Sequence, residues 1–95
     1  MSNIDVAHIR HQGVDLIIVP LKSSFGHKTR AEQNQIIDAL QICASSAGLA
    51  GAVVPVWDAG MGRMGFIAPH NWHPFFSSIG LGFVALNINR RLTCG

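Results

Sequence analysis

The residue types that could support chemistry in the second half of the chain surround a glycine-rich connector. Asp58 is the only acid in that half, and Arg63 follows it five residues later. Together with His70, these residues could form a small acid–base cluster. The alternative is structural, because Asp starts turns well and the glycines at positions 60 and 62 relax the backbone. The sequence leaves both interpretations open.

The most unusual stretch lies directly downstream, at residues 68–76. It contains two prolines, and the aromatic residues Trp72, Phe75 and Phe76 lie within five positions of one another. Tryptophan is prominent at binding interfaces because it buries a large area at a low cost in conformational entropy. The stretch is therefore either a core segment at one end of a sheet or a surface patch that borders a pocket or an interface.

Residues 22–29 form a loop that leads from a predicted strand into a predicted helix. Free amides and the helix dipole at such a position favour an anion. The sequence resembles a phosphate-binding P-loop only superficially, since His27 separates Gly26 from Lys28 and no glycine opens the motif. A solvated loop that caps the helix is the alternative to a phosphate or carboxylate site.

Five histidines are present, and two pairs have a spacing of three residues: His8 with His11, and His70 with His73. Zinc needs a third protein ligand, and neither pair has a cysteine or acid placed to supply it. His8 and His11 would also point to opposite faces of a strand. We therefore expect no metal site and no cofactor. The chain also lacks the Gly-x-Ser-x-Gly motif of a serine hydrolase.

A helix over residues 29–47 has the clearest sequence signals. Thr29 and Glu32 match a capping box, apolar residues then recur at spacings of three and four, and Gly48 follows the last of them. The β-branched run at residues 14–21 predicts a strand, and its unbroken apolar centre predicts burial on both faces. A strand at residues 4–11, joined to it by Gln12 and Gly13, would complete a hairpin.

A second predicted hairpin joins strands at residues 52–57 and 63–68. Pro55 cannot donate a ladder hydrogen bond, so the first of these strands should lie at a sheet edge or contain a bulge. Pro74 suits the first turn of a short helix near residues 73–79. Residues 80–92 fit helical spacing, but residues 84, 86 and 88 also alternate, and Gly80 and Gly82 indicate a break.

These elements predict one α+β domain over residues 1–95, with the order ββαββα. We expect an antiparallel sheet of about four strands, with the long helix on one face and a helical C-terminal segment. The second face of the sheet needs cover as well. Either the C-terminal segment or a second copy of the chain would supply it.

The composition is 48% apolar and only 13% charged, against about 25% charged in an average soluble protein. Such a charge-poor surface favours a homo-oligomer, a dimer or tetramer. The seven basic residues are scattered and give a net charge of +2, which argues against a nucleic-acid partner.

Cys43 falls on the apolar face of the predicted helix, far from Cys94, and we expect a buried free thiol there. The polar N-terminus does not resemble a signal peptide, and the longest apolar run is too short to span a bilayer. The sequence therefore predicts a soluble cytoplasmic protein with reduced thiols and no membrane partner.

Residues 62–69, residues 72–76 and the ending at residues 87–94 resemble small orphan proteins encoded on bacterial integron gene cassettes. The resemblance covers about the last third of the chain. It implies a short bacterial protein from a mobile element, often oligomeric, with no shared fold or active site.

The leading functional hypothesis is a homo-oligomeric binding or interaction module with a cleft for a small anionic or apolar ligand. The expected ligand-binding residues are Trp57, Asp58, Arg63, His70 and Trp72, and the expected interface residues are Trp72, Phe75 and Phe76. One alternative is a small hydrolase or isomerase with Asp58 and His70 as acid and base. The other is an accessory or antitoxin-like partner protein that binds through Trp72.

Overall fold

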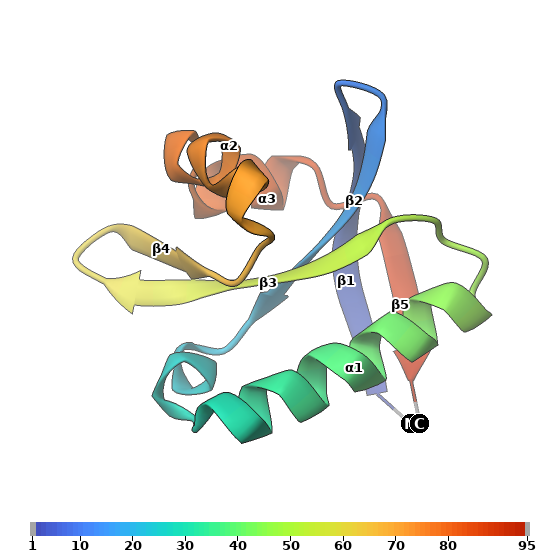
Figure 1. The fold of residues 1–95 in the computed structure, drawn as a ribbon, viewed down its shortest axis with the longest axis horizontal. Helices are drawn as coiled ribbons and strands as arrows, with labels where there is room; N and C mark the ends of the chain where they lie inside the picture. The colour runs from blue at the N-terminus through green and yellow to red at the C-terminus, as the bar shows by residue number, and fades with distance from the viewer. Residues whose placement is uncertain (1, 95) are drawn as a thin grey trace.

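The computed structural model describes residues 2–94 of the chain. Five strands form one mixed sheet in the order β4-β3-β2-β1-β5, with helices on both of its faces (Figure 1). The α+β class expected from the sequence is confirmed. The strands are β1 (Ser2–His11), β2 (Val14–Leu21), β3 (Ala52–Gly60), β4 (Arg63–Phe66) and β5 (Arg90–Cys94). The α-helices are α1 (Arg30–Ser46), α2 (His73–Ser78) and α3 (Leu81–Leu86), and the 3₁₀ helices are η1 (Ser23–His27) and η2 (His70–Trp72).

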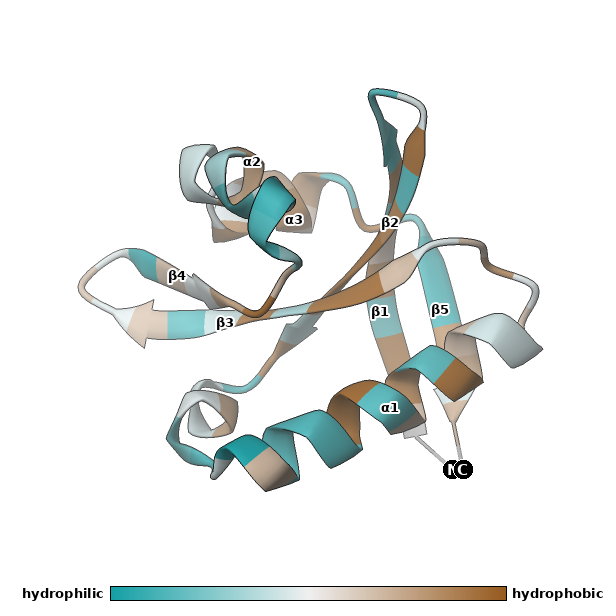
Figure 2. Cartoon of the chain, in the orientation of Figure 1, coloured by the Kyte–Doolittle hydropathy of each residue, from teal (hydrophilic) through white to brown (hydrophobic). Residues whose placement is uncertain are grey.

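Strand β2 is the centre of the sheet. Leu16, Ile17, Ile18 and Val19 are each at most 1% exposed, which confirms the predicted burial of both faces. Because side chains alternate along a strand, Ile17 and Val19 pack toward α1, whereas Leu16 and Ile18 pack toward α2 and α3. Figure 2 shows the hydrophobic stretches of β2 and β3 between α1 and the α2–α3 pair. The second face of the sheet is thus covered within the chain.

Helix α1 begins and ends as its sequence predicts. The amide of Glu32 donates to the Thr29 hydroxyl at 3.2 Å, and the Glu32 carboxylate accepts from the Thr29 amide at 3.1 Å. These hydrogen bonds hold the pKa of Glu32 below its ordinary value. Gly48 follows the helix with a φ of 81°, the left-handed conformation that glycine tolerates best. Within residues 2–94, no helix is long and apolar enough to cross a membrane.

The prediction of a purely antiparallel, four-stranded sheet is wrong. Strands β2 and β3 pair in parallel, because α1 returns the chain to the same end of the sheet before β3 begins. Strand β3 also lies inside the sheet rather than at its edge, although it contains a bulge between Asp58 and Gly60. The Pro55 carbonyl accepts from the Ile67 amide at 3.2 Å, on the β4 side of the strand. The missing N–H of Pro55 faces the same side, where the pairing with β4 has ended at Phe66, so no sheet hydrogen bond is lost.

The sequence left helix and strand open for residues 80–92, and the structure contains both. The C-terminal segment, expected to be helical, is helical only as far as Leu86. Asn87 ends α3, with its side-chain amide donating to the Phe83 carbonyl at 2.8 Å. Asn89 then exchanges two 2.8 Å hydrogen bonds with the backbone of His8, in the manner of a strand residue. These contacts align the chain with β1, and β5 continues as an antiparallel edge strand. Edge pairing of this kind depends on residues 84 to 92 positions apart, from Val6 with Arg90 (90 − 6) to Ser2 with Cys94 (94 − 2), which local spacing does not encode.

Cys43 and Cys94 form a disulfide, so the expectation of free thiols is wrong. The Cα atoms lie 5.8 Å apart, and the bond connects α1 to the edge strand β5. Leu92 and Cys94 have the same orientation on β5, and Leu92 packs in the core beneath α1. The pairing of β5 with β1 therefore places Cys94 beneath the helix face that contains Cys43. The closed loop spans 51 residues.

We expect the double variant Cys43→Ser/Cys94→Ser to unfold with a free energy about 2–4 kcal/mol lower than the oxidised protein, because the loop is then open in the unfolded state. Urea titration followed by circular dichroism measures the difference. Dithiothreitol should lower the midpoint of the wild type and leave that of the variant unchanged. Two free thiols in the folded, unreduced protein would contradict the assignment.

Candidate functional site

The proline-containing stretch after β4 folds into η2 and α2 and sorts its aromatic residues between core and surface. The Trp72 amide donates to the Pro69 carbonyl at 2.9 Å, and Pro74 lies in the first turn of α2. Phe76 is 1% exposed and packs on the sheet with Ile18. Trp72 and Phe75, three residues apart, remain partly exposed on the same side of the helical segment. Phe76 therefore anchors α2 in the core. Because it is buried, it is not exposed to contact a partner at the expected interface.

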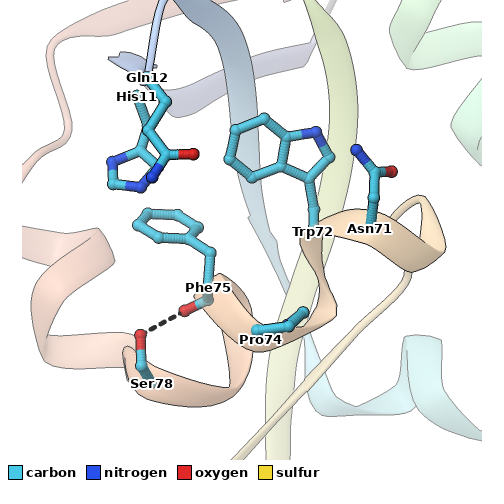
Figure 3. A pocket seen from close by; sticks show the side chains of 7 residues that line it. All are labelled: His11, Gln12, Asn71, Trp72, Pro74, Phe75 and Ser78. Carbon is cyan, nitrogen blue, oxygen red and sulfur yellow. Dashed lines mark hydrogen bonds between the residues drawn. The ribbon is translucent and has the colours of Figure 1, made fainter.

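His11, at the end of β1, joins Trp72 and Phe75 in an aromatic cluster (Figure 3). Its ring stacks on Phe75 with centroids 4.3 Å apart and an interplanar angle of 29°. Trp72 stands edge-on to both rings, with its centroid 5.8 Å from His11 and 6.0 Å from Phe75. The cluster borders an open cleft of about 500 Å³, which we call the aromatic cleft. Its lining residues are His11, Gln12, Asn71, Trp72, Pro74, Phe75 and Ser78.

The β1–β2 turn determines where the imidazole lies. Gln12 and Gly13 adopt positive φ angles of 51° and 77°, as in the two-residue turns that match the twist of a hairpin. The hairpin projects on the same side of β3 as α2 and α3 (Figure 1). His11 and His8 have opposite orientations on β1, and the His8 ring instead hydrogen-bonds the Ala50 carbonyl at 2.9 Å.

Two of the polar side chains that line the aromatic cleft are amides. In the described part of the chain, the side-chain amides of Gln12 and Asn71 make no hydrogen bond to another residue. Figure 3 shows Gln12 beside His11, with its amide oxygen toward Trp72, and Asn71 on the other side of Trp72. The Ser78 hydroxyl is already engaged, because it donates to the Phe75 carbonyl at 2.6 Å. The cleft thus combines aromatic rings with two amides that have both donors and acceptors to offer.

Trp57, expected in the same pocket as Trp72, lies on the α1 side of the sheet. Its ring is held between two glycines: a Cβ added at Gly26 or at Gly65 would collide with the indole. It also packs against Phe25, with ring centroids 5.1 Å apart. The sheet therefore separates the two tryptophans, and these contacts give Trp57 a packing role between η1 and β4.

The other expected site residues are dispersed as well. The Asp58 carboxylate accepts from the Gly60 amide at 2.8 Å, which is the turn interaction, and it lines a hollow of about 340 Å³ beside Trp57. Arg63 lines a different hollow, of about 330 Å³, beside Phe66 and the α2–α3 connection. The His70 ring lies 5.3 Å from that of His73. Of the five expected ligand-binding residues, Trp72 alone lines the aromatic cleft.

Sequence reasoning found the aromatic stretch but not its partners. His11 and Gln12 come from a hairpin about 60 residues upstream, and the contact depends on how far the β1–β2 hairpin extends beyond β5 and β3. Nothing in the sequence pointed to Asn71 except its position next to Trp72. Among residues 2–94, no three His, Cys, Asp or Glu side chains are arranged to hold a metal ion.

Comparison with known proteins gives no further assignment. No protein-family model matches the chain, and neither the curated proteins nor the solved structures contain a match. The resemblance to integron-cassette proteins stays a prediction.

The packing of Trp57 against Gly26 and Gly65 can be tested. Gly65→Ala should lower the free energy of unfolding by about 1–3 kcal/mol, because the new methyl group displaces the indole. The Trp57 indole resonance in a ¹H–¹⁵N spectrum should move with it. Gly82→Ala is the matched control, since its Cβ meets open space within α3, and it should leave stability unchanged or raise it. Equal stabilities of Gly65→Ala and wild type would contradict this packing role.

Proposed function

We propose that the protein is a small-ligand-binding module and that the aromatic cleft takes a flat, aromatic or heteroaromatic molecule with hydrogen-bonding groups on its edge. The observation that carries the proposal is the open cluster of His11, Trp72 and Phe75, with the amides of Gln12 and Asn71 beside it. Aromatic rings favour a flat partner because offset stacking and edge-to-face contacts both become available to it.

The size and rigidity of the cleft support this function. Its volume of about 500 Å³ lies within the range of about 300–1,000 Å³ that is typical of ligand pockets. Phe76 and Val84 fix the helical segment on the sheet, and the His11–Phe75 stack connects it to the hairpin. A cleft formed from packed elements loses little conformational entropy when a ligand binds.

The structure supports ligand binding better than it supports catalysis in which Asp58 and His70 act as acid and base. The Asp58 carboxylate is engaged in the β3–β4 turn, and the His70 ring packs beside His73. The lining of the aromatic cleft contains no carboxylate, and its one hydroxyl is hydrogen-bonded to the backbone. His11 is its titratable group, without a charged partner in the lining to complete an acid–base pair.

A matched pair of fragments tests the proposed binding. Benzamide carries a planar ring and an amide, and cyclohexanecarboxamide carries the same amide on a puckered ring. In a Trp57→Phe protein, where Trp72 is the remaining tryptophan, benzamide should change the fluorescence with a dissociation constant near 1 mM, about −4 kcal/mol. Cyclohexanecarboxamide should bind at least about five-fold more weakly, because it cannot stack.

The variants His11→Ala and Phe75→Ala provide the structural check, with titrations read by ¹H–¹⁵N spectra. Each should weaken benzamide binding about five-fold or more, since each removes one ring of the stack. His27→Ala removes an exposed imidazole outside the cleft and should leave the affinity unchanged. Equal binding of the two amides, or binding that is unaffected by the loss of His11 and Phe75, would refute the proposed function.

Self-association is the second part of the proposal, with a homodimer as the expected state. The support is the low charge of the chain and the exposure of apolar side chains on α3, where Leu86 is 89% exposed and Phe83 lies beside Phe75.

The cytoplasmic location also stays a proposal. The Cys43–Cys94 disulfide counts against it, since such bonds are rare in the cytoplasm.

Light scattering coupled to size-exclusion chromatography tests the association. We expect twice the 10.2 kDa of one chain, and Leu86→Glu should return the mass to that of one chain because a buried charge disfavours the contact. Ile42→Glu, on the opposite side of the sheet, is the control and should leave a dimer. A wild-type monomer at all concentrations would contradict self-association without affecting the cleft.

A further inference from the structure

We infer that the protein has a second binding site, between η1 and the start of α1, for an apolar molecule with a single negative charge. A pocket of about 290 Å³ opens there, which we call the lysine pocket. Its lining residues are Leu21, Lys22, Ser24, Phe25, Lys28 and Ile36. The ligand class is a monocarboxylate with a short aliphatic or aromatic body.

The walls of the lysine pocket are hydrocarbon. Leu21 comes from the end of β2, Phe25 from η1 and Ile36 from α1, so three elements converge on one apolar surface. Phe25 is 3% exposed and packs on Trp57. Its carbonyl accepts from the buried Gln33 side chain at 3.0 Å and from the Lys28 amide at 3.2 Å. This network fixes η1 against α1.

Two lysine side chains border these walls, almost entirely with their carbon atoms. Lys22 and Lys28 both line the pocket, and within residues 2–94 the one ion pair is Arg91 with Asp5, on the far edge of the sheet. Glu32 is the nearby acid. The Thr29 amide and hydroxyl donate to its carboxylate at 3.1 and 3.0 Å and lower its pKa, and the charge of Lys28 adds to this lowering. The two lysines therefore bring positive charge beside an apolar pocket, and neither forms an ion pair within residues 2–94.

The same geometry argues against a phosphate in this loop. The capping box places the Glu32 carboxylate at the N-terminus of α1, where an anion would otherwise meet the free amides and the helix dipole. A compact polyanion would also leave the walls formed by Leu21, Phe25 and Ile36 unused. A carboxylate on a hydrocarbon body matches both features, because its charge reaches the lysines while its body removes apolar surface from water. The site lies on the α1 side of the sheet and does not depend on the aromatic cleft.

Sodium octanoate and 1-octanol, below their aggregation limits, are the probes. Titrations of ¹⁵N-labelled protein should shift the amides of Ser24, Phe25, Lys28 and Ile36, with octanoate binding about five-fold or more tightly than octanol. Lys22→Gln/Lys28→Gln should remove that preference. Arg10→Gln/Arg30→Gln loses the same charge at exposed positions outside the pocket and should retain it.

Ile36→Ser, read by the same shifts, tests the apolar wall separately and should weaken both probes alike. Circular dichroism confirms that each variant is folded before its titration is interpreted. The inference is overturned if octanol binds as tightly as octanoate, if the lysine variant keeps the preference, or if the shifts map to the aromatic cleft. Inorganic phosphate that binds as tightly as octanoate would overturn it as well.

Discussion

The structure depends on one constraint: the central strand β2 is apolar on both faces. Leu16 through Val19 would cost several kcal/mol if either face were left in water, since each buried aliphatic side chain contributes about 1.5–3 kcal/mol. Helix α1 covers one face, and α2 with α3 covers the other. The parallel crossover through α1 and the return of the chain across the opposite face both serve this requirement. The sheet becomes the middle layer of three. After α3 the chain returns to the edge of the sheet, where β5 pairs with β1.

This arrangement also determines where the two proposed sites lie. The aromatic cleft forms where α2 meets the projecting hairpin, on one side of the sheet. The lysine pocket forms where η1 meets α1, on the other side. Phe76 and Phe25 have the same packing role beside the two sites: each is buried and holds its helical segment on the sheet. The disulfide secures the far end of α1 to the edge strand, away from both sites.

The sequence predicts what is encoded locally. The capping box of Thr29 and Glu32, the turn at Gln12 and Gly13, and the buried run in β2 all follow from neighbouring residues and agree with the structure. Parallel pairing of β2 with β3, the strand at residues 90–94 and the disulfide depend on contacts between distant segments. The candidate site divides in the same way: Trp72 and Phe75 were found within one stretch, but His11 reaches them only through the tertiary fold. Trp57 and Trp72, both conspicuous in the sequence, lie on opposite sides of the sheet.

The central claim is that a single chain covers both faces of β2. An isotope-filtered NOE experiment on an equimolar mixture of ¹³C-labelled and unlabelled protein tests it directly, using the Phe76 ring and the Ile18 methyl groups as reporters. We expect strong cross-peaks between these residues within the labelled chain and none between labelled and unlabelled chains. Cross-peaks between chains, or none at all, would show that a second copy covers this face or that it remains open, and would contradict the account.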